Sequence, residues 1–463
     1  MSINDNFEFL NIGLPEDILR RKTWGDFEGA VRLIDKRLAM DIPEALRSCL
    51  IVERELILRL PKDYPYTQAE ALAMIRADVP DFTEEEFQEM MDDNKFDWIY
   101  INGEPHFFLR FYRTLIKTDL AFAKRAGLVD DGRGDGSEGA NEPEKKSWRE
   151  ISMETMREKG SYAKRIRIRA SVQIKDEAFE KGKLVRVHIP IPAACIQQSE
   201  IKLEAFSSQP TYIAPEDAPQ RTVYWEEVLE ENHPFWVEYS YVHTAPYADP
   251  MKIVPDAEQP TFFTNEENPH IVFTPYIKEL VKTLTAGVTN PAEKASIFYD
   301  FVTLNVKYSF MREYFGLENI AENCARNFKG DCGVQALLFI TLCRCAGIPA
   351  RWQSGLCAGP DDAGMHDWAM FYVAPYGWMF ADPSYGGAAA RTNNEVLRRH
   401  YFGNLDPYRM VANCEFRAPL DPPKKHWRFD PYDNQAGEIE YEDRGLRGPE
   451  YRRNMELLEC TDV

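Results

Sequence analysis

The amino-acid sequence predicts a multidomain α+β protein with a helical N-terminal domain, a β-sandwich middle domain and an α+β core. A chain of 463 residues with 44% hydrophobic content is longer than one hydrophobic core usually organises. Apolar residues recur at helical spacing before a Gly-rich, charged stretch, and at every second position after it. Further on, three helical segments precede a predicted hairpin, which is an order typical of α+β folds.

These changes in pattern divide the chain into five segments. The segments are a helical domain at 1–128, a flexible linker at 129–147, a β-sandwich-like domain at 148–268, a core at 269–415 and a C-terminal extension at 416–463. The linker is rich in Gly and charged residues and has no apolar anchor. Its Arg-Gly-Asp at 133–135 matches an adhesion tripeptide, but we interpret it as plain linker because the chain shows no export signal.

The N-terminal domain has four segments in which apolar and charged residues alternate near the helical period, at 27–38, 45–60, 67–77 and 83–92. Thr83 with Glu86 forms a capping-box pattern. Asn102-Gly103 predicts the turn of a small hairpin, and a helix is predicted from about residue 109 to 126. Such a domain could recruit a substrate or partner, or it could simply pack on its own core; the sequence leaves both open.

The middle domain is predicted from strands that alternate at period two. Ile166 and Ile168 fall on one face of the first strand, and Arg167 and Arg169 fall on the other. Similar strands are expected at 184–191, 200–206, 221–225 and 236–243. Pro- and acid-rich turns separate them, as in a β-sandwich. We interpret the basic row as a solvated sheet face.

The core opens with two helices, whose starts are indicated by Thr274-Pro275 and Asn290-Pro291. A third helix is expected from Val334 to Ala346, ended by Gly347 as its C-cap. Cys332 precedes this helix in a Gly-flanked turn. At a helix N-terminus the unsatisfied backbone N–H groups and the macrodipole favour thiolate over thiol, and the same N–H groups can stabilise an oxyanion.

His366 and Asp382 are predicted to lie at the two ends of a hairpin. His366 begins a strand, a turn around Pro375 reverses the chain, and Asp382 ends the returning strand. A hairpin of this length brings the carboxylate beside the imidazole, where it can hold the ring in one tautomer and stabilise imidazolium. An imidazole near Cys332 can take the thiol proton and return it to a leaving amine. The sequence therefore predicts a catalytic triad of Cys332, His366 and Asp382.

The order of these motifs resembles the transglutaminase-like superfamily, a branch of the papain-like thiol enzymes. The resemblance covers roughly residues 270 to 390 and rests on Gly-x-Cys-Gly before an apolar helix, Ala-Gly-Ile-Pro-Ala-Arg, His-x-Trp, Gly-Trp and Asp-Pro. It implies a papain/transglutaminase-like α+β catalytic core, with Cys332 as nucleophile, His366 as general base and acid, and Asp382 as orienting carboxylate. The Val-x-Ile-Pro-Ile-Pro element at 187–192 also resembles the β domain that precedes this core in many bacterial transglutaminase-like proteins.

Two features depart from the family pattern. Animal transglutaminases use a tryptophan upstream of the nucleophile to stabilise the oxyanion, but no tryptophan occurs here between Trp236 and Trp352. Tyr308 and Asn327 are the replacement donors that we consider. The histidine strand often carries an acidic residue where this chain has Met370.

Other residues near these motifs have simpler interpretations. Cys343 and Cys345 fall inside the apolar helix, where burial makes a thiol inert, and Cys357 also lacks the Gly-flanked turn. Arg409 could reach the cleft, but we expect an exposed strand arginine.

The composition argues against a nucleic-acid-binding protein and against a membrane protein. A net charge of −20 argues against nucleic acid as a partner, because phosphate binding needs a basic patch. No segment approaches the roughly 20 apolar residues that span a bilayer, so we expect no membrane partner and a cytoplasmic location. Nine scattered cysteines indicate free thiols in a reducing compartment. Neither a cofactor nor a metal site is predicted.

The expected activity is acyl transfer at an amide carbonyl of a peptide or protein substrate. We expect hydrolysis, by a cysteine peptidase or a glutamine deamidase. Two alternatives remain open: cross-linking by a protein-glutamine transglutaminase, and a non-catalytic binding or assembly protein on the same scaffold. The oligomeric state is not indicated by the sequence.

Overall fold

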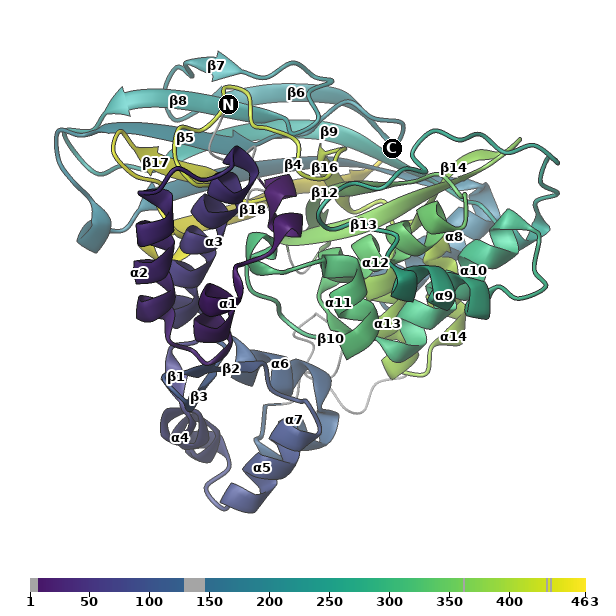
Figure 1. Ribbon diagram of the computed structural model, residues 1–463. Coiled ribbons are helices and arrows are strands. Elements are labelled where there is room, and N and C mark those ends of the chain that lie inside the picture. Colours follow the sequence, from purple (N-terminus) through teal and green to yellow (C-terminus); the bar gives the residue numbers. More distant parts are fainter. Residues whose placement is uncertain (1–6, 129–145, 361–362, 430–431, 434) are drawn as a thin grey trace.

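The computed structural model describes residues 7–128, 146–360, 363–429, 432–433 and 435–463. The predicted linker lies outside these ranges, except for its last two residues. Its Arg-Gly-Asp tripeptide therefore also lies outside them. The chain is a mixed α/β protein with several sheets (Figure 1). Helices of the N-terminal region lie below the sheets on one side, and helices of the core lie below them on the other. Over the described ranges, no helix combines the length and the apolar character that a membrane crossing needs.

The N-terminal region is mainly helical and has its own hydrophobic core. Its helices are α1 (Glu16–Thr23), α2 (Phe27–Leu38), α3 (Glu44–Asp63), α4 (Gln68–Asp78), α5 (Glu84–Asp92), α6 (Phe111–Thr118) and α7 (Leu120–Arg125). Its strands are β1 (Tyr66–Thr67), β2 (Trp98–Ile101) and β3 (Glu104–Phe107). The predicted capping box is confirmed: Thr83 accepts from the backbone of Glu86, and Glu86 accepts from the backbone of Thr83.

The hairpin predicted in this region is confirmed. Asn102 and Gly103 connect β2 to β3 with φ angles of 51° and 86°, the positive values that a tight hairpin turn requires. The single helix predicted for 109–126 is wrong, because the chain forms two helices, α6 and α7. Asp119 leaves the helical region, with φ −113° and ψ 92°, and its side chain accepts a hydrogen bond from the backbone of Phe122 to cap α7.

Two four-stranded sheets follow helix α8 (Trp148–Lys159). Their strand orders are β17-β5-β8-β7 and β18-β4-β9-β6, and both sheets contribute to one hydrophobic core. The strands are β4 (Ser161–Ile174), β5 (Leu184–Pro190), β6 (Gln198–Phe206), β7 (Tyr212–Ile213), β8 (Thr222–Val228), β9 (Phe235–Pro246), β17 (Glu438–Tyr441) and β18 (Tyr451–Asp462). The alternation predicted for the first strand is confirmed, because Ile166 and Ile168 are buried. Arg167 and Arg169 on the opposite face pair with Glu238 of β9.

The C-terminal segment completes these sheets. Strand β17 pairs antiparallel with β5, and β18 pairs antiparallel with β4 along nearly its whole length. Ile439 and Tyr441 of β17 are fully buried in the shared core. The segment predicted as a C-terminal extension therefore supplies one edge strand to each sheet.

The core combines a helical layer with a five-stranded sheet of order β15-β14-β13-β12-β16. Its helices are α9 (Pro275–Leu284), α10 (Pro291–Asn305), α11 (Ile320–Asn327), α12 (Cys332–Cys345), α13 (Pro383–Arg391) and α14 (Glu395–His400). Its strands are β12 (Ala350–Ala358), β13 (Ala363–Val373), β14 (Gly377–Ala381), β15 (Phe402–Gly403) and β16 (Arg409–Asn413), with the short pair β10 (Lys307–Tyr308) and β11 (Lys329–Gly330) beside them. The three predicted helices and the β13–β14 hairpin are confirmed.

The N-terminal region contacts the core along the segment that leads toward α12. The Arg59 guanidinium pairs with Glu313 and donates to two backbone carbonyls, those of Arg428 at 2.8 Å and Phe429 at 2.9 Å. Arg110 of the N-terminal region lies over the Phe310 ring, 4.6 Å from its centroid. These contacts fix the connection that carries Tyr314 to the nucleophile helix.

Candidate active site

Cys332 lies at the N-terminus of α12, as the sequence predicts, although the helix begins at Cys332 itself and not at Val334. The preceding Asp331 caps the helix, because its carboxylate accepts a hydrogen bond of 3.3 Å from the backbone N–H of Val334. A Cβ atom at Gly333 would collide with the Tyr314 hydroxyl and with the Asp367 carboxylate. The absence of a side chain at Gly333 therefore lets two polar groups reach the N-terminus of the helix beside the thiol.

The Cys332 thiol lies against residue 367. Its Sγ donates to Asp367 Oδ2 at 3.2 Å, and the backbone N–H of Asp367 points at the sulfur. Burial raises the pKa of the thiol well above its usual value, and the negative charges of Asp367 and Asp331 add to this effect. In this arrangement Cys332 is held as a thiol rather than as a thiolate.

Asp367 belongs to a group of buried carboxyl side chains. Its Oδ1 accepts from the Gln435 side chain, and its Oδ2 lies 3.4 Å from the Tyr314 hydroxyl oxygen. The same hydroxyl donates to Asp331 Oδ1 at 2.5 Å. Burial, followed by the nearby charges of Asp433 and Asp331, raises the pKa of Asp367 well above its usual range. Polar groups from three distant parts of the chain therefore gather around the carboxyl that holds the thiol.

His366 and Asp382 form the second half of the site. His366 Nε2 lies 2.7 Å from Asp382 Oδ2, and both side chains are buried. Burial opposes ionisation of Asp382, but His366 and Arg409 outweigh it and lower the pKa of the carboxyl. Burial also lowers the pKa of His366, although Asp382 opposes that shift. With Nε2 engaged by an ionised carboxylate, Nδ1 is the ring nitrogen left for proton exchange.

Arg409 forms an ion pair with the Asp382 carboxylate of the His366–Asp382 pair. Its Nη1 lies 3.0 Å from Asp382 Oδ2, and its Nη2 lies 2.6 Å from Asp406 Oδ2. The expectation of an exposed strand arginine is wrong, because the Arg409 side chain is completely buried between the two carboxylates. The Tyr385 ring covers the imidazole, with 4.5 Å between the ring centroids. Together these contacts fix both the charge and the orientation of the His366–Asp382 pair.

The structure thus brings together two of the three residues of the predicted triad. Asp382 bonds to His366, while the hydrogen bond of the Cys332 thiol goes to Asp367, the residue directly after His366 in β13. In the described parts of the chain, no hydrogen bond joins the thiol to the imidazole. The thiol therefore contacts the residue that follows His366 in β13, and its hydrogen-bond partner is a carboxyl group.

The two side chains considered as oxyanion donors differ in their placement. Tyr308 lies near the start of α12, since it pairs across β10 and β11 with Gly330, and burial raises the pKa of its phenol. Asn327 is exposed at the end of α11. Within the described ranges, no three His, Cys, Asp or Glu side chains are grouped as metal ligands would be.

Sequence reasoning missed several groups at the site. Asp367 stands inside the His-x-Trp motif, so its position beside the nucleophile had a local signal. Tyr314 and Gln435 had none, because each comes from a separate element that only the folded chain brings to residues 332–382. Arg409 was considered as able to reach the cleft, but its burial was not predicted.

One comparison with known proteins identifies a family for the core of this chain. Residues 278–383 match the model of the transglutaminase-like superfamily. Among curated proteins, none matches the chain. A solved structure of a candidate cysteine protease from Cytophaga hutchinsonii is similar, with 16% identity and a TM-score of 0.40 over 65% of this chain and 91% of that one. The periplasmic domain of TgpA from Pseudomonas aeruginosa is also similar, with 13% identity and a TM-score of 0.29 over 57% of this chain and all of that one. At such low identities and TM-scores, neither similarity carries a functional argument.

Proposed function

Because residues 278–383 form a transglutaminase-like domain, we propose that the protein is a thiol enzyme that transfers the acyl group of an amide in a peptide or protein substrate. The observation that supports this proposal best is the buried His366–Asp382 pair, 2.7 Å apart, directly beside the residue that contacts the Cys332 thiol. A buried imidazole with an ionised carboxylate behind it is the base that a thiol nucleophile needs.

In the proposed mechanism, His366 Nδ1 takes the proton of the Cys332 thiol while the sulfur attacks the amide carbonyl. Asp382 stabilises the imidazolium, and backbone N–H groups at the start of α12 stabilise the oxyanion, with the Tyr308 phenol as a further donor. The imidazolium then gives its proton to the departing amine, leaving a thioester on Cys332. Water, activated by the neutral imidazole, hydrolyses this thioester and restores the thiol.

Asp367 opposes the first of these steps. Residues 366 and 367 project to opposite faces of β13, so the thiol has to leave Asp367, and β13 and the start of α12 have to shift, before the sulfur can reach His366 Nδ1. We therefore propose that the arrangement with Asp367 is a resting state, and that substrate binding favours this shift.

Hydrolysis is our preferred outcome for the acyl-enzyme, by peptide cleavage or by glutamine deamidation. A cross-linking enzyme has to admit a lysine amine and exclude water, and the upstream tryptophan that animal transglutaminases share is missing here. All nine cysteines are free thiols, which supports our proposal of a reducing, cytoplasmic location. The buried His366–Asp382 pair favours an enzyme over a non-catalytic scaffold.

Alkylation kinetics test this proposal without knowledge of the substrate. At neutral pH, iodoacetamide should label Cys332 at a rate that depends on His366, since a general base contributes about 10²–10⁴-fold. We expect His366→Ala to slow the labelling of Cys332, measured by peptide mass spectrometry, and His233→Ala, a partly exposed histidine between β8 and β9, to leave it unchanged. Equal rates in the wild type and in His366→Ala would contradict a Cys332–His366 pair.

A further inference from the structure

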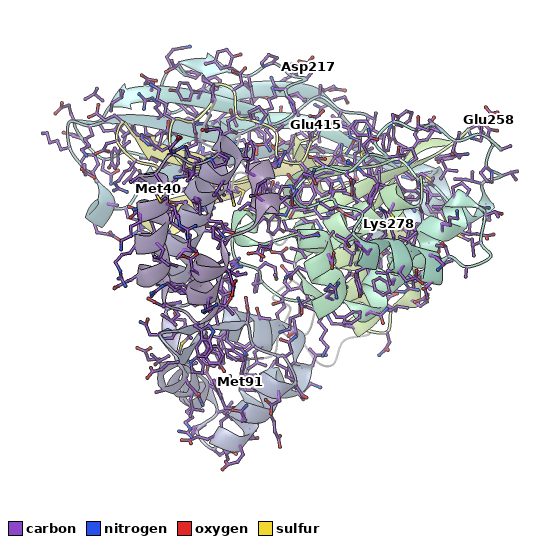
Figure 2. The ribbon with its side chains drawn as sticks, viewed as in Figure 1. Met40, Met91, Asp217, Glu258, Lys278 and Glu415 are labelled. Atoms are coloured by element: carbon purple, nitrogen blue, oxygen red, sulfur yellow. The ribbon has the colours of Figure 1, made fainter. Side chains whose placement is uncertain are left out.

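A cavity of about 210 Å³ lies where the loop after β5 meets the end of β16. Cys195 of that loop and Cys414, the residue after β16, both line it. Asp217 and Glu415, which also line the cavity, are both labelled near the sheets in Figure 2. The two cysteines are half-buried and pack against the same apolar cluster, which includes Trp368. The fold therefore brings two thiols together on one cavity wall, although they are far apart in sequence.

The two thiols are close enough to affect each other's ionisation: Cys414 raises the pKa of the Cys195 thiol, and Cys195 lowers the pKa of Cys414. The Gln353 side chain lines the same cavity and also lowers the pKa of Cys414. Its Oε1 accepts from Trp368 Nε1 at 2.9 Å and from Gln197 Nε2 at 2.6 Å. Cys414 therefore lies at the same cavity as a second thiol and an amide side chain whose oxygen is held by two hydrogen bonds.

The charges around the pair also favour a thiolate at Cys414. Arg351 lines the same cavity and donates to the backbone carbonyl of Cys414 at 2.8 Å. The neighbouring Cys195 thiol and then the Arg351 charge lower the pKa of Cys414 despite burial, while Cys414 raises the pKa of Cys195. Cys345 and Cys460 are also half-buried, but burial raises the pKa of each. Cys414 thus combines thiolate character, access from a cavity and an adjacent thiol, which are the properties of an oxidisable cysteine.

We propose that Cys195 and Cys414 form a redox-sensitive dithiol that a hydroperoxide converts to a disulfide at this cavity. The Cys414 thiolate attacks the peroxide oxygen and breaks the O–O bond, which gives a sulfenic acid and, after protonation, water or an alcohol. The Cys195 sulfur then attacks the sulfenic sulfur, its thiol proton leaves with the hydroxyl group as water, and the S–S bond forms. Two thiols lose two electrons in total, and one peroxide gains them. A dithiol reductant reverses the reaction by thiol–disulfide exchange.

This disulfide would connect two parts of the molecule. The loop after β5 belongs to the four-stranded sheets, whereas β16 is an edge strand of the five-stranded sheet of the core. Oxidation would therefore fix the sheets to the core on the face of β13 that carries Trp368 and Met370. The proposal is independent of the proposed acyl transfer, because it does not involve Cys332.

Peptide mapping of the full-length protein tests the proposal. The protein is treated with a small excess of hydrogen peroxide, its remaining thiols are alkylated, and peptides are analysed without reduction. We expect a Cys195–Cys414 cross-linked peptide that dithiothreitol removes, while Cys345 and Cys460 remain alkylated. Recovery of Cys195 and Cys414 as separately alkylated peptides, or their pairing with other cysteines, would overturn the proposal.

A single substitution separates the two steps. In Cys195→Ser the attacking thiolate remains but its partner is missing, so dimedone should trap a sulfenic acid at Cys414. Cys345→Ser is the matched control and should give the same cross-link as the wild type. If peroxide leaves Cys414 of Cys195→Ser as unreactive toward dimedone as Cys345, Cys414 is not the oxidised thiol and the mechanism is wrong. If Cys195→Ser folds poorly, the peptide map of the peroxide-treated wild type still shows whether Cys195 and Cys414 form a disulfide.

Discussion

At the scale of single residues, the site is defined by two neighbours with opposite effects on the nucleophile. His366, backed by Asp382 and Arg409, is arranged as a base, whereas Asp367 accepts the hydrogen bond of the Cys332 thiol and keeps it protonated. Adjacent residues of a strand project to opposite faces, so the face of β13 that contacts the thiol carries Asp367, and His366 lies on the other face. The identity of the thiol's partner decides whether Cys332 is reactive.

Removing the charge of residue 367 should therefore activate the thiol. Burial is the largest cause of the raised pKa of Cys332, and the Asp367 carboxylate adds to it. Asp367→Asn removes only this second contribution, so the thiol pKa should fall but stay above its usual value. The pH at which iodoacetamide labelling of Cys332 reaches half its maximal rate measures this shift. Asp217→Asn, on the wall of the separate cavity, serves as the control and should not move the midpoint. An unchanged or higher midpoint in Asp367→Asn would show that Asp367 does not hold the thiol.

At the scale of elements, the two four-stranded sheets depend on strands from the end of the chain. Strand β17 fills an edge beside β5, and its Ile439 is fully buried in the core that both sheets share. Strand β18 covers β4 in the same way. The last segment is therefore part of the folded β region and carries Gln435 to the candidate site on the way.

A core truncation in β17 tests this dependence. Ile439→Ala should lower the free energy of unfolding by about 2–5 kcal/mol, because it removes buried methyl groups and leaves a cavity. Ile213→Ala in β7 of the same sheet is the matched control, since this side chain is 36% exposed, and it should change stability by about 0.5 kcal/mol or less. Urea denaturation measures both values. Similar losses in the two variants would contradict a buried, structural β17.

The sequence predicted these elements unequally, for physical reasons. Helices with caps, the Asn102-Gly103 hairpin and the alternation of β4 depend on local interactions, so spacing alone revealed them. The break at Asp119 was missed because a capping side chain overrode a continuous helical pattern. The pairing of β17 and β18, and the burial of Arg409, depend on partners remote in sequence, which no local pattern encodes.

At the scale of the whole molecule, the N-terminal region is joined to the core by buried charges. Burial outweighs the attraction of Arg59 and raises the pKa of Glu313 to about 7. Nearby, Lys22 lowers the pKa of Glu318. Two carboxyl groups on the segment that carries Tyr314 therefore link pH to stability in opposite directions.

Glu313→Gln isolates the first of these groups. Between the usual glutamate pKa of 4.5 and about 7, folded Glu313 binds a proton that the unfolded chain releases, so its stabilising contribution is full at low pH and is lost as pH rises. The stability of the wild type relative to Glu313→Gln should fall by up to about 3 kcal/mol as pH rises across this window. Glu318→Gln should show the opposite sign, since a lowered pKa gives a contribution that is lost as pH falls. Urea denaturation across this pH range measures both differences. A pH-independent difference for Glu313→Gln would contradict the burial of a protonated carboxyl at this junction.

The central claim is that Cys332 forms an acyl-enzyme with the help of His366. The most direct measurement is the burst of p-nitrophenol on mixing the protein with p-nitrophenyl acetate, followed by peptide mass spectrometry of the acetylated protein. The account predicts a burst of about one equivalent with the acetyl group on Cys332, no burst in Cys332→Ala, and a burst at least about 100-fold slower in His366→Ala. A burst of equal size in Cys332→Ala, or an acetyl group found only on other residues, would contradict it.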